Sequence, residues 1–236
     1  MRNRNIDIFI SGAGPAGLLA SLSFASLGYS VFCVDPKKPV TQSNEDGADL
    51  RTTAFLQPAK TFMASLGLWE KLEPFAEPME IMRIIDSAGD NWPPIETTAK
   101  DFLASEISDL PFGWNIPNWL LRRTLLENAM EYSNLELKFG LTTSSIIRRD
   151  DAAFVYLNDG SQIKSKLIIG ADGRDSLVRD KSQIKISKRE FSQKALTFIV
   201  THERPHKNAS IEIHRSGGPF TFVPLADFEG NPCSSI

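Results

Sequence analysis

A cluster of three glycines near the N-terminus is the first feature of the chain that could do chemistry. The cluster follows the G-x-G-x-x-G spacing and reads Gly12-Ala13-Gly14-Pro15-Ala16-Gly17. A turn of this kind lets a pyrophosphate approach backbone N–H groups at the start of a helix. Asp35 follows about twenty residues later, where a carboxylate can accept hydrogen bonds from a ribose. The spacing therefore predicts a dinucleotide site; the alternative, an ordinary glycine-rich turn, does not account for Asp35.

A strand, a helix and a second strand must position these residues. Residues 6–10 form an apolar run that is typical of a buried parallel strand. Leucines and an alanine among residues 18–25 give the next segment the apolar face of a helix, and Gly28 is a natural stop. Residues 30–34 predict the second strand, which ends at Asp35. The N-terminal segment is therefore a βαβ unit.

A second acidic residue follows a similar apolar strand. Residues 166–169 predict a strand that leads into Gly170-Ala171-Asp172-Gly173. We expect this strand to join the same parallel sheet, which would place Asp172 at the carboxyl edge, where ligands bind. Residues 135–139 predict another strand, and residues 145–157 predict a hairpin around a pair of aspartates.

Two adjacent arginines lie near the start of a further predicted helix, which follows Asn118 as a plausible N-cap. Its expected buried face consists of Leu120, Leu121, Leu125 and Met130. The helix dipole does not favour cations at this end, so Arg122 or Arg123 could face an anion. The other interpretation is that both arginines are solvent-exposed, and the spacing alone leaves both open.

A second region has a different pattern. Gln57 and Pro58 begin a predicted helix that carries Phe62, Leu66 and Trp69, and residues 79–87 predict a strand before an Ala88-Gly89-Asp90 turn. Residues 93–111 are expected to be irregular. Short strands are predicted at residues 195–201, 210–214 and 220–223, with the start of another at 233–236. These strands predict an antiparallel sheet that residues 79–87 join.

The composition of the chain argues against several classes of function and site. The net charge of -3 gives no support for a nucleic-acid partner. Cys33 and Cys233 form no C-x-x-C pair, so neither a disulfide framework nor a zinc site is expected. His202 and His206 would share a face on a helix, but their segment is predicted as strand and loop and contains Pro205, so no metal site is expected. Without a signal peptide or a long apolar stretch, we expect a cytoplasmic protein.

Three motifs in order carry a family resemblance. They are the glycine turn with Asp35, the segment Asp49-Leu50-Arg51-Thr52, and the segment GADGRDSLVR at residues 170–179. Together they resemble the single-component FAD-dependent aromatic hydroxylases, the group of para-hydroxybenzoate hydroxylase. Within that group, residues 51–54, 66–69 and 218–225 are most similar to the ubiquinone-biosynthesis hydroxylases.

The resemblance implies an α/β fold. It comprises a Rossmann-like FAD-binding domain, with a parallel sheet and a β-meander, and an inserted antiparallel α+β substrate domain. The implied FAD-binding domain is residues 1–75 and 112–182, and the substrate domain is residues 76–111 and 183–236.

The resemblance also implies roles at matching positions. The turn from Gly12 to Gly17 would cradle the FAD pyrophosphate, and Asp35, where the family more often has Glu, would hold the adenosine ribose. Arg51 would contact the flavin and Arg122 the FAD phosphates. The backbone at Thr143 would meet adenine, and Asp172 would lie beside the pyrophosphate and ribityl chain. No acid, base or nucleophile and no metal ligand is implied.

The implied chemistry is that of the flavin, which NAD(P)H reduces. Oxygen then gives a flavin hydroperoxide that hydroxylates an aromatic ring, here a lipid-tailed polyprenylated phenol of ubiquinone biosynthesis. For such a substrate, the resemblance also implies peripheral association with the inner membrane or with a biosynthetic complex. Alternatives are a catabolic aromatic hydroxylase of the same group, or a non-catalytic FAD-binding fragment.

The family carries a third motif, a Gly-Asp pair followed by Ala-Ala-His, which is not found before Ile236. We therefore expect the chain to correspond to the N-terminal part of the family's length, and not to hydroxylate by itself. Trp114-Asn115-Ile116-Pro117 partly resembles the W-x-W-x-I-P motif of flavin-dependent halogenases. Because it precedes the GADG segment instead of following it, that function is disfavoured.

Overall fold

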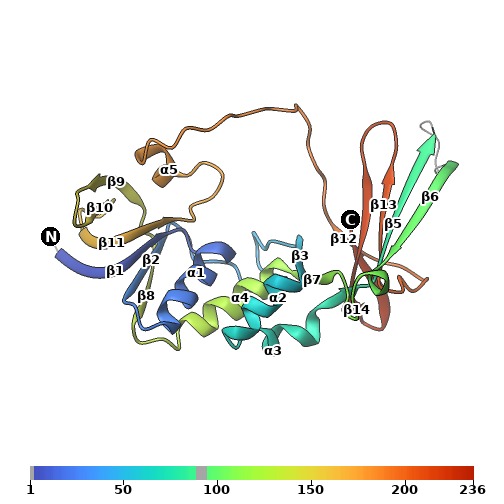
Figure 1. Ribbon diagram of the computed structural model, residues 1–236, viewed down its shortest axis with the longest axis horizontal. Coiled ribbons are helices and arrows are strands. Elements are labelled where there is room, and N and C mark those ends of the chain that lie inside the picture. The colour runs from blue at the N-terminus through green and yellow to red at the C-terminus, as the bar shows by residue number, and fades with distance from the viewer. Residues whose placement is uncertain (1–2, 89–94) are drawn as a thin grey trace. The chain divides into compact units, whose positions relative to one another are not determined.

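The computed structural model describes residues 3–88 and 95–236, which form two compact units (Figure 1). The first unit is Met1–Gly47 with Leu121–Ser192, and the second is Ala48–Leu120 with Gln193–Ile236. Both units are discontinuous in sequence. The second compact unit includes residues 48–75 and 112–120, which the family resemblance places in the FAD-binding domain. The predicted domains are defined by the ligand that each binds, and a division by compactness does not test this. Their bounds therefore remain a prediction.

The first unit contains a six-stranded sheet in the order β8-β2-β1-β11-β10-β9. Its strands are β1 (Asn3–Ser11), β2 (Val31–Asp35), β8 (Leu135–Phe139), β9 (Thr143–Arg148), β10 (Ala153–Leu157) and β11 (Gln162–Gly170). Strands β8, β2, β1 and β11 are parallel neighbours, while β11, β10 and β9 pair antiparallel as a meander. The parallel sheet, the hairpin and the meander are confirmed.

The parallel strands form because both faces of the sheet are covered. On one face, a core cluster contains Phe9, Phe32, Val34, Val155, Leu157 and Ile163. The helix α1 (Pro15–Ser26) buries Leu18, Leu22 and Ala25, and its contacts are with β1, β2 and β8. Each large apolar side chain removed from water contributes about 1.5–3 kcal/mol, and Ala25 contributes less.

Two further helices belong wholly or partly to the first unit. Helix α4 (Asn118–Ala129) begins in the second unit and continues in the first from Leu121. Its buried face includes Leu120, Leu121 and Leu125, as predicted. Met130 was expected there but is 63% exposed, because the helix ends one residue earlier. The short helix α5 (Leu177–Lys181) follows β11.

The second unit contains a six-stranded sheet, β12-β15-β14-β13-β5-β6, and a three-stranded sheet, β3-β7-β4. The strands of the larger sheet are β5 (Ile81–Ala88), β6 (Ile95–Leu103), β12 (Ile199–Thr201), β13 (Ala209–His214), β14 (Phe220–Phe228) and β15 (Asn231–Ser235). The smaller sheet contains β3 (Thr52–Leu56), β4 (Glu77–Met79) and β7 (Gly113–Pro117). As predicted, β5 joins the later strands; its pairing with β13 is parallel, while the other pairs of the larger sheet are antiparallel.

Local predictions for the second unit were wrong at several places. The irregular segment contains β6, which pairs with β5 over most of its length, so backbone pairing overrides a sequence poor in apolar alternation. The predicted helix ends with α2 (Gln57–Ser65), because Gly67 takes a φ of +65° before α3 (Trp69–Leu72). Residues 195–198 form no strand. The expected turn residues 89–90 and the prolines 93–94 lie outside the described residues.

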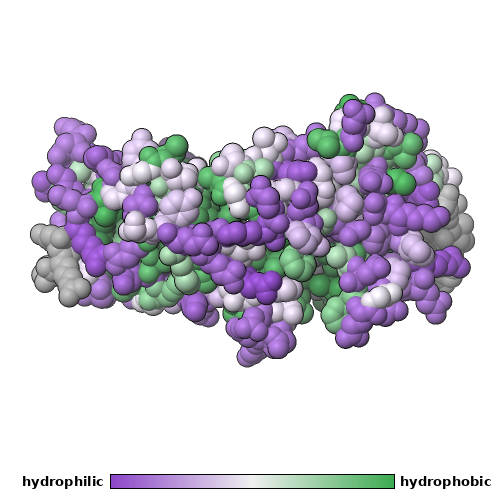
Figure 2. All heavy atoms as spheres, turned by 90° about the horizontal axis from the view of Figure 1, so that it is seen from below, coloured by the Kyte–Doolittle hydropathy of each residue, from purple (hydrophilic) through white to green (hydrophobic). Residues whose placement is uncertain are grey.

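No helix in the described part of the chain is long and apolar enough to cross a membrane. On the face drawn in Figure 2, apolar residues lie among hydrophilic ones, and such scattered exposure is common on protein surfaces. Both cysteines are buried free thiols, and no cluster of potential metal ligands occurs among residues 3–88 and 95–236.

Candidate cofactor site

The glycine turn connects β1 to α1, and two of its glycines are required by packing. Gly12 has a φ of +105°, and a Cβ there would lie 2.2 Å from the carbonyl oxygen of Ala171. A Cβ on Gly17 would lie 1.8 Å from the carbonyl oxygen of Gly12. The turn therefore fits tightly against the loop after β11, and neither position has room for a side chain.

Gly14 is different. Apart from Gly14 and its two chain neighbours, no residue has an atom within 4 Å of the place where its Cβ would be. Its φ of -70° is one that any residue adopts, so neither the fold nor the backbone requires glycine there. Gly14 is the N-cap of α1, where the first backbone N–H groups have no partner inside the helix. Because packing does not require glycine at position 14, the missing side chain leaves open space for a ligand beside the first N–H groups of α1.

That space is a cavity of ≈ 560 Å³ at the carboxyl edge of the parallel sheet. Ser11 at the end of β1 is in register with Val34 of β2 and with Gly170 of β11, so the three strand ends meet at one place. The lining residues are Ser11, Gly12, Gly14, Val34, Asp35, Pro36, Leu141, Thr142, Thr143, Ala171, Asp172, Gly173, Asp175 and Leu177. All of them belong to the first unit.

The described residues that line the cavity include three carboxylates and no lysine or arginine. An anionic ligand here would therefore depend on backbone N–H groups and on the positive end of the α1 dipole. Backbone N–H groups do not titrate in the physiological range, so such donors suit a pyrophosphate.

Asp35 is fixed beside the glycine turn. One carboxylate oxygen accepts the N–H of Ala13 at 2.8 Å, and the other accepts the N–H of Lys37, also at 2.8 Å. Each carboxylate oxygen has two acceptor positions, so both retain capacity for hydroxyl donors. The end of β2 and the glycine turn thus hold the carboxylate where a ribose could bond to it.

Thr143 lies on the floor of the cavity at the start of β9. It is 4% exposed, and its hydroxyl donates to the hydroxyl oxygen of Ser11 at 3.0 Å. This bond joins the meander to the end of β1. The side chain is thus engaged within the protein, and the expected contact of its backbone with adenine stays a prediction.

Asp172 lines the cavity but its carboxylate is directed at α5. One oxygen accepts the N–H groups of Leu177 at 2.9 Å and Val178 at 3.1 Å. The other oxygen accepts the hydroxyl of Ser176. The predicted ligand residue is therefore also the cap of a helix.

The two predicted arginines are placed differently. Arg122 is half-buried on α4 in the first unit and is not among the described residues that line the cavity. Arg51 is in the second unit, where its Nε and Nη2 donate to Asp49 at 2.7 and 2.8 Å. This bidentate bond raises the pKa of Arg51. The structure thus brings together the glycine turn, Asp35, Thr143 and Asp172 around one cavity.

Several lining residues had not been assigned from the sequence. Ser11 is the last residue of β1, and Asp175 and Leu177 belong to the GADGRDSLVR segment but were given no role. The available signal was the position of Ser11 at the end of β1 and of Asp175 and Leu177 in the loop and helix that follow β11. No signal in the sequence predicted the hydrogen bond between the hydroxyls of Ser11 and Thr143, because the two residues are 132 positions apart.

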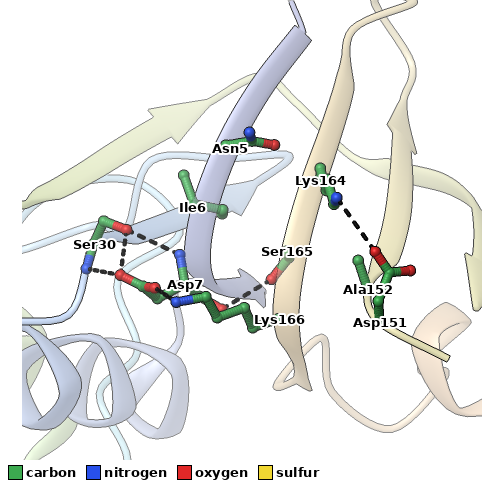
Figure 3. A pocket seen from close by; sticks show the side chains of 9 residues that line it. All are labelled: Asn5, Ile6, Asp7, Ser30, Asp151, Ala152, Lys164, Ser165 and Lys166. Atoms are coloured by element: carbon green, nitrogen blue, oxygen red, sulfur yellow. Dashed lines mark hydrogen bonds and ion pairs between the residues drawn. The ribbon is translucent and has the colours of Figure 1, made fainter. Parts of the chain in front are cut away.

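A second hollow, of ≈ 330 Å³, lies nearer the amino ends of β1 and β11 (Figure 3). Its charged side chains face one another. Lys166 donates to Asp7 at 2.6 Å, and Lys164 lies 3.5 Å from Asp151. Asp7 also accepts the N–H and hydroxyl of Ser30, and with Lys166 these bonds lower the pKa of Asp7 well below its usual range.

Comparison with known proteins gives a consistent result. The family described as FAD binding domain matches residues 5–228. "Ubiquinone hydroxylase UbiL" of Rhodospirillum rubrum is 28% identical over 221 residues, covering 93% of this chain and 49% of the relative. "3-demethoxyubiquinol 3-hydroxylase" of Escherichia coli is 25% identical over 228 residues, covering 96% of this chain and 56% of the relative. The chain thus spans about half the length of these curated relatives.

A solved structure also matches. The structure of PqsL from P. aeruginosa in complex with 2-aminobenzoylacetate superposes with a TM-score of 0.77 at 20% identity. The match covers 98% of this chain and 60% of PqsL. At that identity the likeness establishes the fold.

Proposed function

Because the chain belongs to the FAD-binding domain family, we propose that the cavity beside Gly14 holds FAD. We propose further that the chain supplies the cofactor-binding part of a monooxygenase that hydroxylates an aromatic ring. The observation that carries the first proposal is the open space at Gly14, since that glycine serves no packing purpose. Asp35, bonded to the Ala13 N–H at 2.8 Å, supplies a fixed acceptor beside that space.

The residues around the cavity suit the parts of FAD. The helix N-terminus at Gly14 to Gly17 would hold the pyrophosphate, and Asp35 would accept the hydroxyls of the adenosine ribose. Thr143 and Asp172 would lie along the same molecule, because both line the same cavity. The proposed contacts of Arg51 and Arg122 rest on the family resemblance. When bound, FAD supplies the redox chemistry that activates dioxygen, with electrons from NAD(P)H.

The protein's own contribution would be binding, orientation and exclusion of water. The turn that carries the helix donors is tightly packed, because even a Cβ on Gly12 or Gly17 would collide with neighbouring backbone. A site whose donors do not reorganise binds an anionic group at lower cost. Among the residues lining the cavity, none is proposed as an acid, base or nucleophile.

The substrate we propose is a phenol of ubiquinone biosynthesis with a polyprenyl tail. The support is that "Ubiquinone hydroxylase UbiL" and "3-demethoxyubiquinol 3-hydroxylase" match more than nine-tenths of this chain. A lipid-tailed substrate would favour work at a membrane surface, so peripheral association belongs to the same proposal. Hydroxylation itself would be an activity of the whole protein, since the relatives are about twice as long.

The test of cofactor identity is a pair of titrations. FAD and NAD⁺ are added separately to the purified chain, and binding is followed by flavin fluorescence and by calorimetry. We expect saturable one-to-one binding of FAD and weaker binding of NAD⁺. Tight binding of NAD⁺ with no binding of FAD would contradict the proposal.

A further inference from the structure

The loop after β11 closes on itself through side-chain hydrogen bonds. The hydroxyl of Ser176 donates its proton to Asp172 and accepts the N–H of Arg179 at 3.1 Å. It is therefore the N-cap of α5, and it is only 8% exposed. One hydroxyl provides one donor and up to two acceptor positions, so these bonds use its single donor. Ser176 connects the Asp172 carboxylate to the helix that follows it.

Other residues of the segment 170–179 also fix the conformation of the loop. The guanidinium of Arg179 donates to the carbonyl oxygen of Arg174 at 2.8 Å. Gly173 takes a φ of +86°, which turns the chain sharply. A Cβ on Gly170 would lie 2.9 Å from the Cβ of Val178, so α5 packs directly on the end of β11. The loop conformation is thus fixed at both ends.

This loop is one wall of the proposed cofactor cavity. Ala171, Asp172, Gly173 and Asp175 line the cavity, while Ser176 does not. Three of about four acceptor positions of the Asp172 carboxylate are used by α5 and Ser176, which leaves one on Oδ1. Held this way, the carboxylate charge is bonded to the first N–H groups of α5 and to the Ser176 hydroxyl.

We propose that Ser176 is a positioning residue for the cofactor cavity. Its hydroxyl holds the Asp172 carboxylate against α5, which fixes the wall formed by residues 171–175 and leaves one acceptor of Asp172 for a ligand hydroxyl. This inference rests on the proposed function, which assigns FAD to this cavity. Without the hydroxyl, the carboxylate keeps its bonds to the Leu177 and Val178 N–H groups, but Oδ1 loses its only partner within the loop and can shift toward the pyrophosphate and repel it.

The experiment is a double-mutant cycle on FAD affinity, with Ser176→Ala, Asp172→Asn and the double variant. Ser176→Ala should weaken FAD binding roughly tenfold, as expected for the loss of a hydrogen bond to a charged group. In the Asp172→Asn background the same substitution should change FAD affinity by less than about threefold, because the coupled charge is gone. Ser176→Thr keeps the hydroxyl and should restore the affinity of the unaltered chain.

Ser182→Ala is the matched control, since it removes a hydroxyl at the C-cap of the same helix, and it should leave FAD affinity unchanged. If Ser176→Ala does not fold, Ser176→Gly replaces it, because glycine is tolerated at an N-cap. Amide exchange of the ligand-free protein provides a second readout: Leu177 and Val178 should exchange faster in Ser176→Ala than in the control.

The outcomes separate the two proposals. An unaltered chain that binds FAD, with equal affinity in Ser176→Ala or with additive effects in the cycle, overturns the positioning role alone. An unaltered chain that binds no FAD overturns the proposed function and this inference with it. A tenfold loss that Ser176→Thr reverses and that Asp172→Asn abolishes supports the inference.

Discussion

Two hollows lie toward opposite ends of the parallel strands in the first unit, and their charges are arranged differently. Near the amino ends, the carboxylates of Asp7 and Asp151 face Lys166 and Lys164 (Figure 3). At the carboxyl edge, Asp35 and Asp172 accept backbone N–H groups instead. Ion pairs satisfy the charges of the first hollow within the protein. The second hollow keeps helix donors and carboxylate acceptors available for a ligand.

The difference follows from strand direction. Parallel strands bring their carboxyl ends to one edge, where the following loops enter helix N-termini. The glycine turn and the GADGRDSLVR loop are both of this kind. The amino edge receives chain from helix ends and turns, so its polar side chains are left to pair with each other. We therefore expect substitutions at the two hollows to separate binding from stability.

The largest expected effect is at Gly12, where fold and site depend on one residue. In Gly12→Val, a side chain would begin 2.2 Å from a carbonyl oxygen and at a φ of +105°. Strain and overpacking together should lower the free energy of unfolding by about 3 kcal/mol or more. Urea unfolding followed by circular dichroism measures this. A midpoint equal to that of the unaltered chain would show that the turn is not packed as described.

Asp35→Ala should act on binding, with an added cost in stability because the buried Ala13 N–H loses its acceptor. The substitution removes an acceptor that the glycine turn holds in place, so FAD affinity should fall by about 1.5–3 kcal/mol, the worth of a hydrogen bond to a charged group. Lys37→Ala is the control, because Lys37 contacts Asp35 through its backbone N–H, which alanine keeps. Calorimetric titration of both variants gives the answer, and similar losses in the two would argue against a ribose contact.

Asp7→Asn should act on stability alone, and by the smallest amount. The pKa of Asp7 is lowered in the folded state, so its ion pair contributes stability above the ordinary pKa of about 3.9. That contribution is lost as pH falls through the folded-state pKa. The unaltered chain and Asp7→Asn should therefore differ in unfolding midpoint at neutral pH and converge in strong acid. FAD affinity should be the same in Asp7→Asn as in the unaltered chain. A large loss of FAD affinity in this variant would contradict the separation of the two hollows.

The sequence was most informative where structure is local and periodic. The glycine turn, the βαβ unit and the placement of Asp172 could be predicted, because each depends on a short segment with a strong pattern. Strand β6 could not, because its pairing with β5 decides its conformation. Met130 was assigned to a buried face by helical spacing, and a helix end one residue earlier exposes it.

The site shows the same division. The glycine turn and Asp35 could be named from their spacing, and Thr143 from the family resemblance, but the bonds that hold them could not. Thr143 and Ser11, and Ala13 and Asp35, join segments far apart in sequence. Asp172 was expected as a ligand contact and is also a helix cap, a role that Ser176 and α5 reveal only in three dimensions.

The most direct test of the central claim, that the space at Gly14 belongs to the cofactor, is FAD titration of Gly14→Thr. Threonine suits the N-cap of α1 and the φ of -70°, so the unfolding midpoint in urea should stay within experimental error of the unaltered chain. FAD binding should fall below detection because the new side chain occupies the position through which a pyrophosphate would approach the Gly14 backbone. A folded Gly14→Thr protein that binds FAD with unaltered affinity would contradict the account.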